Sequence, residues 1–104
     1  MNMATQYDLT VVSNQSITPH MRRVLLCGDS LENFPADQES GYVKVLFPQQ
    51  EGPTRVRSFT IRSFDVSKRV LALDFVDHST NGLASAWANG CQTGDAVSIR
   101  GPGE

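Results

Sequence analysis

Two stretches of the chain carry side chains that could bind a ligand or take part in chemistry. In the first, residues 57–62 (RSFTIR), basic, hydroxyl and aromatic residues alternate. On a strand, Arg57 and Phe59 would share one face, and Ser58 and Thr60 would share the other. A guanidinium offers phosphate a forked donor, an aromatic ring offers a stacking surface, and a hydroxyl can bond a ring heteroatom. The pattern suits a flat, phosphorylated cofactor, and an ordinary half-buried strand with solvated charges is the alternative.

The second stretch, residues 77–85, is a polar loop that leads into the most convincing helix of the sequence. Helix N-termini present unpaired amides and a partial positive charge, so they hold phosphates. Gly82 would permit close backbone approach, and Ser85 could add a hydroxyl. His78 could stack on a ring, donate to a phosphate or simply face water. A helix start capped by its own polar side chains is the alternative interpretation.

Other kinds of chemistry have little support. The chain has no GxxxxGK[ST] loop, no GxGxxG after a strand, no GxSxG elbow and no HExxH motif. Cys27 and Cys91 lie far apart without paired His or Cys spacing, so neither a zinc site nor a disulfide is indicated. We expect both to be small, buried or semi-exposed thiols. No metal ligand and no catalytic side chain is assigned.

The elements that must position these residues are mostly short strands. Apolar and polar residues alternate with a period of two along most of the chain, and turn residues interrupt the alternation. Strands are predicted at residues 7–12, 21–27, 42–47, 55–64, 69–76 and 96–100, with turns at 13–15, 65–68 and 93–95.

Helical structure is expected at two places only. Residues 30–35 suggest a short helical turn, with Ser30 as its cap and Pro35 as its stop. Residues 83–88 are rich in Ala and free of Pro, and Gly90 fits their C-terminal end. Trp87 is expected to seal this helix to the rest of the fold. Six strands and one helix predict a mainly β fold, a small antiparallel barrel or sandwich. Of the two we favour a six-stranded antiparallel Greek-key barrel capped by the short helix.

Length and charge exclude several classes of protein. The 104 residues, 39% of them apolar, can form one domain, and folding could bury about 65% of the extended chain's surface. The 9 basic and 11 acidic residues form no basic block, so nucleic-acid binding is not expected. No apolar run approaches the roughly 20 residues of a membrane helix. The first ten residues (MNMATQYDLT) show no secretory signal.

In order and spacing, these residues resemble the flavin domain of the siderophore-interacting proteins. These are bacterial ferric-siderophore reductases, distantly related to the ferredoxin reductases. Residues 57–62 correspond to the family's R-x-Y-T-x-R flavin signature. Residues 73–78 (LDFVDH) and 82–88 (GLASAWA) resemble its D-F-V-x-H and G-P-A-S-x-W-A stretches. Further matches to its strands and turns lie at residues 21–35, 42–48, 93–95 and 101–103.

The resemblance implies FAD as the cofactor and gives the residues of the first stretch their roles. Arg57 would bind the FAD pyrophosphate. Phe59 would stack on the isoalloxazine, and Thr60 would approach the N5 edge, with Ser58 counted among the binding residues. Phe59 stands where tyrosine is usual, so stacking would survive while a phenolic hydrogen bond is lost.

The resemblance also assigns residues beyond the first stretch. Val76 and His78 would line the flavin and its ribityl or adenine side. Phosphate would be held by helix amides at a turn of four residues, Gly82, Leu83, Ala84 and Ser85. Leu83 replaces the family's proline, so this turn would be less rigid.

Members of this family continue past G-P-G into a second α/β domain that binds NAD(P)H and helps hold the siderophore. The resemblance therefore implies that residues 1–104 are the FAD-binding domain of a cytoplasmic ferric-siderophore reductase that releases Fe(II). NAD(P)H or ferredoxin would donate electrons through the absent domain. We expect a truncated chain that does not sustain NAD(P)H-dependent turnover alone.

Two other functions stay open from the sequence. One is a barrel that mainly docks onto a partner, with flavin absent or incidental. The other is a flavin reductase domain that serves a different electron acceptor. Bound FAD would discriminate the first of these from the reductase.

Overall fold

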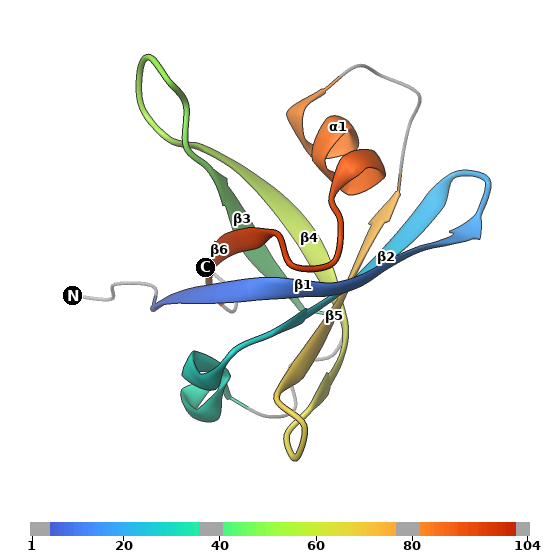
Figure 1. Ribbon diagram of the computed structural model, residues 1–104, viewed down its shortest axis with the longest axis vertical. Helices are drawn as coiled ribbons and strands as arrows, with labels where there is room; N and C mark the ends of the chain where they lie inside the picture. The colour runs from blue at the N-terminus through green and yellow to red at the C-terminus, as the bar shows by residue number, and fades with distance from the viewer. Residues whose placement is uncertain (1–4, 36–40, 77–81, 102–104) are drawn as a thin grey trace.

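The computed structural model describes residues 5–35, 41–76 and 82–101. Within them, six antiparallel strands close into a barrel in the order β1-β2-β5-β4-β3-β6 (Figure 1). Strands β2 and β3 follow each other in sequence but are not neighbours, as in a Greek key, which confirms the predicted fold class. The strands are β1 (Gln6–Thr18), β2 (Met21–Cys27), β3 (Tyr42–Phe47), β4 (Arg55–Asp65), β5 (Val70–Val76) and β6 (Ala96–Arg100).

The core fills the inside of the barrel. Buried apolar residues alternate with more exposed ones along β1 as far as Val11 and around Phe59 in β4, whereas the last three residues of β3 and residues 71–73 of β5 are all buried. Closure gives every strand a partner on each side over part of its length. The strand residues that are at most 3% exposed are Tyr7, Leu9, Val11, Val24, Leu26, Val43, Val45, Phe59, Ile61, Leu71, Leu73 and Ile99.

Two helical segments lie on opposite sides of β1 in Figure 1, the 3₁₀ segment η1 (Asp29–Asn33) and the helix α1 (Leu83–Gly90). Helix α1 buries Ala84 and Ala88 against the barrel. The Trp87 ring packs edge-on against Phe47 and Phe59, with ring centroids 5.9 and 5.5 Å apart. Trp87 therefore seals α1 to the barrel, as expected from the sequence.

The turn predicted at residues 13–15 is wrong, because β1 continues through them to Thr18. The ladder with β2 shifts register between Val11 and Ser13, and Asn14 then pairs with Val24. A bulge of this kind absorbs polar residues without ending the strand. The chain reverses instead at residues 19–20, so the β1–β2 hairpin is longer than its sequence pattern predicts.

Two smaller predictions also need correction. Ser30 does not cap η1; its hydroxyl donates to the Asp8 carbonyl oxygen at 3.4 Å, and Gly28 occupies the cap position. A Cβ at Gly28 would lie 2.8 Å from Leu9 Cδ2 and 3.1 Å from the Asp8 carbonyl oxygen, so close approach favours glycine there. Arg69 belongs to the preceding turn with φ 56°, and β5 begins one residue later.

The remaining features concern cysteines, metals and membranes. Cys27 is half-buried and Cys91 is buried, and both are free thiols, as expected. The residues that the structure describes contain no group of three or more His, Cys, Asp or Glu side chains suited to a metal ion. Over the same residues, no helix is long and apolar enough to cross a membrane.

Candidate functional site

Strand β4 presents two chemically different faces, as its sequence predicts. Phe59 lies inside the barrel, whereas Ser58 and Thr60 are exposed on its outer surface. Arg57 is half-buried, and its Nη1 donates a 2.7 Å hydrogen bond to the Val56 carbonyl oxygen. No other described residue bonds the Arg57 guanidinium, so most of its donors remain available to a ligand.

A cavity of about 490 Å³ opens on the outer surface over β2, β4 and β5. Thr60 pairs with Asp74 and Met21 pairs with Val76, so these residues of three strands meet at one place. The cavity brings together three of the residues predicted to bind the cofactor. Its lining consists of Met21, Ser58, Thr60, Asp74, Phe75 and Val76.

An ion pair fixes one wall of this outer cavity. Arg23 Nε donates to Asp74 Oδ1 at 2.7 Å, and Arg23 Nη2 donates to Asp74 Oδ2 at 3.1 Å. This fork holds both side chains in one geometry. The hydrogen bond to Asp74 raises the pKa of the Arg23 guanidinium above its ordinary value. The Asp74 carboxylate is thus neutralised within the wall, which leaves hydroxyl and apolar groups as the main surface.

The aromatic rings near the outer cavity are arranged differently from expectation. Phe59 is only 2% exposed and packs against Trp87 and Phe75, the Phe75 ring centroid lying 5.1 Å away. Phe75 is half-buried and lines the cavity, which Phe59 does not. The structure therefore places Phe59 in the core and Phe75 at the cavity wall. Stacking of Phe59 on a flavin stays a prediction.

The N-cap residue of α1 contributes no capping side chain. Gly82 is the N-cap residue, and a Cβ there would meet no atom within 4 Å. Ala84 is buried against the barrel and Leu83 packs against the core, so both direct their side chains away from a ligand at the helix start. The first amides of the helix have no partner within it, which suits an anion. His78 lies outside the described residues.

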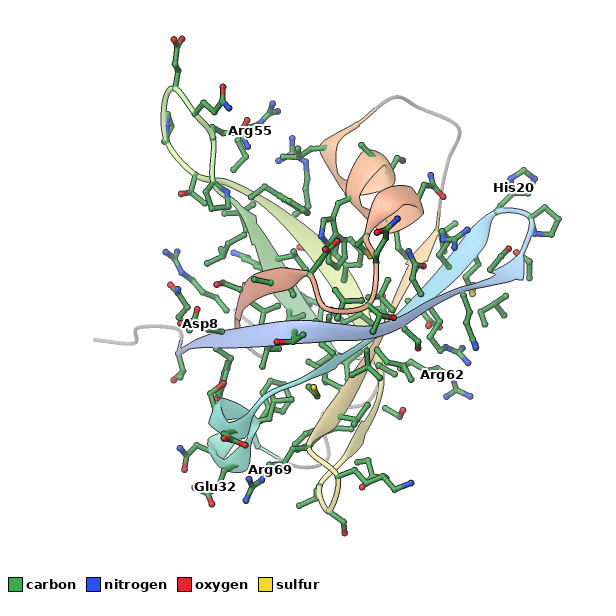
Figure 2. All side chains as sticks on the ribbon, in the orientation of Figure 1. Asp8, His20, Glu32, Arg55, Arg62 and Arg69 are labelled. Atoms are coloured by element: carbon green, nitrogen blue, oxygen red, sulfur yellow. The ribbon has the colours of Figure 1, made fainter. Side chains whose placement is uncertain are left out.

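Helix α1 lies next to the N-terminal end of β4, which carries Arg55 and Arg57. Trp87 packs on Phe47, and Phe47 pairs with Arg55, two residues before Arg57. In Figure 2, Arg55 lies beside the β3–β4 hairpin, whereas Arg62 lies on another side of the molecule. Helix α1 and the first residues of β4 thus lie at the same end of the barrel.

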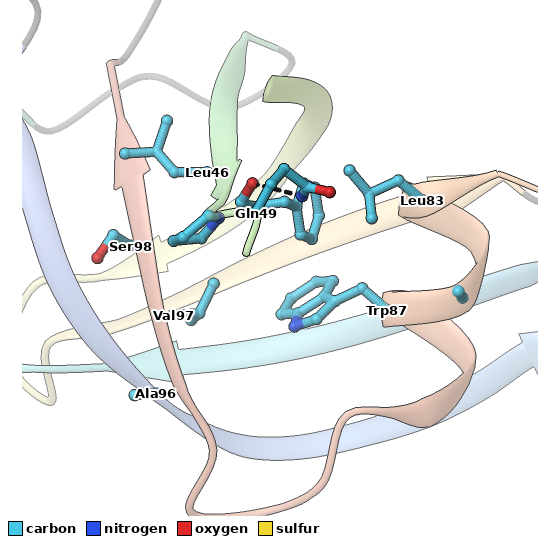
Figure 3. A pocket seen from close by; sticks show the side chains of 10 residues that line it. Leu46, Gln49, Leu83, Trp87, Ala96, Val97 and Ser98 are labelled. Atoms are coloured by element: carbon cyan, nitrogen blue, oxygen red, sulfur yellow. Dashed lines mark hydrogen bonds between the residues drawn. The ribbon is translucent and has the colours of Figure 1, made fainter. Parts of the chain in front are cut away.

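A second cavity, also of about 490 Å³, lies between α1, β6 and the end of β3 (Figure 3). Most of its lining is apolar, and Gln49 Nε2 donates to the Phe47 carbonyl oxygen at 2.8 Å at its edge. Of the residues predicted to bind the cofactor, it includes Leu83. It has no charged side chain in its lining, so it offers a phosphate only neutral donors such as Gln49 and Ser98.

The donor set of the outer cavity and its surroundings fits FAD. The dinucleotide needs cations or amides for two phosphates, and a partly apolar surface with a few hydrogen-bond donors for its ring system. Arg57 and the start of α1 provide the first. Ser58, Thr60 and Phe75 provide the second. The residues present are therefore chemically suited to this cofactor.

Comparison with known proteins agrees with this chemistry. A family model for the siderophore-interacting FAD-binding domain matches residues 10–56 and 52–104. The chain belongs to this family. FAD is the ligand that the family description names, which confirms the cofactor expected from the sequence.

Two curated relatives carry names that describe iron reduction. Ferric vibriobactin reductase ViuB from Vibrio cholerae is 30% identical over 91% of this chain and 42% of its own length. NADPH-dependent ferric-chelate reductase from Escherichia coli is 29% identical over 91% of this chain and 44% of its own. The chain thus spans less than half the length of these relatives.

Solved structures share the fold. The siderophore-interacting protein SipS from Aeromonas hydrophila superposes with a TM-score of 0.83 and 33% identity, covering 96% of this chain and 44% of SipS. A ferredoxin NADP⁺ reductase from Neisseria gonorrhoeae superposes with a TM-score of 0.71 at 17% identity, covering 94% of this chain and 37% of that one. The second likeness shows the barrel fold alone.

Sequence reasoning assigned no role to three residues of this siderophore-interacting domain that line the outer cavity, Met21, Asp74 and Phe75. Asp74 and Phe75 precede Val76, a predicted binding residue, on β5. Asp74 could have been found from the predicted pairing of β4 with β5, because the residue opposite Thr60 lies on the same face of the sheet. Met21 follows from pairing between β2 and β5, which the sequence does not specify.

Proposed function

We propose that this domain binds FAD across the outer cavity and the start of α1, and that it serves a ferric-siderophore reductase. The observation that carries the proposal is the outer cavity itself. It brings Ser58 and Thr60 of β4 together with Phe75 and Val76 of β5. Strand β4 also carries Arg57. The family, whose FAD-binding domain this is, supports the same ligand.

The phosphates would be held at the end of the barrel beside α1. Arg57 would give its forked donors to the pyrophosphate, since one of its nitrogens alone is engaged by a described residue. The backbone amides of residues 82–85 would add donors at the positive end of the helix. The helix contributes through its backbone here, because Leu83 and Ala84 pack toward the barrel.

The ring system would lie against the hydroxyl and apolar wall of the outer cavity. Thr60 would reach the N5 edge, and Ser58 would offer a second hydroxyl on the same strand. Val76, 43% exposed, would cover part of the flavin. Phe59 lies in the core behind Phe75, so its ring would have to become exposed to stack on the flavin. His78 stays a predicted contact of the ribityl or adenine side.

The role of the domain would be to hold the cofactor where electrons can leave it. FAD, when bound, supplies the redox chemistry, taking up electrons in pairs and giving them singly to ferric iron. The substrate would be a ferric siderophore, whose Fe(III) gains one electron and leaves as Fe(II). NAD(P)H or ferredoxin would supply electrons through a second domain. These assignments rest on the relatives' names and on the family.

The test is iron reduction by the FAD-loaded chain under anaerobic conditions. The loaded domain is photoreduced, mixed with a ferric siderophore, and Fe(II) is followed with a colorimetric chelator. We expect faster reduction than free FAD gives at the same concentration, and no sustained turnover when NADPH replaces light. Equal rates with free FAD would overturn the reductase assignment. Sustained NADPH turnover would overturn the need for a second domain.

A further inference from the structure

Asn14 of β1 links three elements through one amide side chain. Its Nδ2 donates to the carbonyl oxygens of Ala88 at 2.8 Å and Cys91 at 3.1 Å, and it lies 3.3 Å from Cys91 Sγ. Its Oδ1 accepts a 2.9 Å hydrogen bond from Arg22 Nε. Asn14 thereby joins β1 and β2 to the C-terminal end of α1.

These hydrogen bonds reach carbonyl groups at the C-terminal end of α1. The last carbonyls of a helix lack internal partners and carry partial negative charge. Helix α1 has no basic residue in its last turn. Asn14 supplies the missing donor, and the charge of Arg22 on its Oδ1 polarises the amide toward the helix. The pair replaces the cation that usually stabilises a helix end.

The segment that follows α1 is fixed to the same strand. Thr93 Oγ1 donates to the Val12 carbonyl oxygen at 2.9 Å, and Gly94 N donates to the Val11 carbonyl oxygen at 2.8 Å. Helix α1 is therefore anchored to β1 at its C-terminal end. At its N-terminal end the cap residue is Gly82, which has no side chain to cap the first amides. In an eight-residue helix about 12 Å long, a tilt at the anchored end displaces the other end.

We infer that Asn14, held by Arg22, is a positioning residue for FAD binding. It acts through α1, setting where Trp87 and the amides of residues 82–85 stand relative to Arg57. Neither Asn14 nor Arg22 lines the outer cavity. The inference rests on the proposed function, because it concerns the phosphate end of the same site. FAD binding would thus depend on a residue that does not itself contact the cofactor.

The test uses Asn14→Ala, with Gln15→Ala as the matched control. Gln15 is the next residue of β1, is exposed and makes no side-chain hydrogen bond within the described residues. FAD, ADP and riboflavin are titrated separately, because ADP carries the phosphates and riboflavin carries the ring system. Emission of Trp87, the one tryptophan of the chain, reports on the packing of α1 without any ligand.

We expect Asn14→Ala to raise the Kd for FAD and ADP about tenfold, the effect of losing bonds to a helix end. Riboflavin affinity should stay within about twofold of the wild type. Trp87 emission should shift to longer wavelength as α1 loosens. Gln15→Ala should match the wild type in all four measurements. Arg22→Gln, which keeps Asn14, should show the same pattern with a smaller effect, and it replaces the alanine variant if that fails to fold.

Wild-type affinities for FAD and ADP in Asn14→Ala would overturn the inference. Equal loss of ADP and riboflavin affinity would also overturn it, because general loosening of the barrel would then be the cause. A wild-type chain that binds none of the three ligands would overturn the proposed function, and the positioning role with it. In that case a shifted Trp87 emission would still show that Asn14 anchors α1.

Discussion

Thr60 and Asp74 face each other across the β4–β5 ladder, and both line the outer cavity. The two carboxylate oxygens of Asp74 accept hydrogen bonds from Arg23. Thr60 is exposed, and no described residue bonds its hydroxyl. The wall thus keeps its charges paired and leaves a neutral hydroxyl for a ligand, which matches a ring system without net charge.

Thr60→Val should weaken FAD binding without unfolding the domain. The change removes the hydroxyl and keeps the shape, so one hydrogen bond to the ring is lost, worth about 1 kcal/mol or roughly fivefold in Kd. Thr10→Val on β1 is the control, since Thr10 is also an exposed strand threonine away from the cavity. FAD titration of both variants decides; equal affinities would remove Thr60 from the site.

Arg57→Ala should weaken FAD binding more strongly. Charge-assisted bonds to phosphate would be lost, raising the Kd by about 2 kcal/mol, or roughly thirtyfold. Arg62→Ala removes an exposed arginine from the same strand and should leave the Kd unchanged. Added salt should weaken wild-type binding more than Arg57→Ala binding. Unchanged affinity in Arg57→Ala would show that the phosphates bind elsewhere.

Two phenylalanine variants separate the core ring from the ring at the cavity wall. Phe59→Leu should lower the free energy of unfolding by about 1–2 kcal/mol, because Phe59 is buried against Trp87. Phe75→Leu should cost less stability and raise the FAD Kd about threefold to tenfold. Urea unfolding and FAD titration are measured on both. A larger affinity loss in Phe59→Leu, at wild-type stability, would restore Phe59 as the stacking ring.

Stability should fall in alkaline solution because of Cys91. Burial, with a smaller contribution from the charge of Asp95, raises the pKa of the Cys91 thiol above its ordinary 9.0. A raised pKa in the folded state means that the unfolded chain loses its proton first. The contribution of Cys91 is therefore complete below about pH 9 and declines as the pH rises from there toward the folded pKa.

Urea unfolding of the wild type and of Cys91→Ser at pH 7.5 and pH 10 measures this effect. The wild type should lose more stability between the two pH values than Cys91→Ser loses. Serine keeps a polar atom near Asn14 and does not ionise in this range. Identical pH dependence in the two proteins would mean that the folded thiol is not protected from ionisation.

The barrel could be predicted from the sequence because its strands carry alternating or continuous apolar residues and turn residues separate them. The pattern around Phe59 assigned both faces of β4 correctly, and the apolar run of β5 identified its partner in the hairpin. Polar residues misled the strand prediction where a bulge let β1 continue through Asn14. The local sequence does not show that β1 keeps pairing with β2 beyond the bulge, because this depends on the partner strand.

The site was less accessible to sequence reasoning. Residue types and family likeness selected Thr60 and Arg57, and strand periodicity placed them on opposite faces. Burial of Phe59 depends on Trp87, which arrives from a helix 28 positions later in the chain (87 minus 59). The anchor at Asn14 involves residues 74 and 77 positions away. Such contacts exist only once the barrel has closed.

The central claim is that this barrel binds FAD through Arg57 and the start of α1. Equilibrium titration of the wild-type chain with FAD tests it most directly, with Trp87 quenching and visible flavin absorbance followed in one sample. The account predicts saturable binding of one FAD per chain, strongly weakened by Arg57→Ala and unaffected by Arg62→Ala. No saturable binding, or the same binding in both arginine variants, would contradict it.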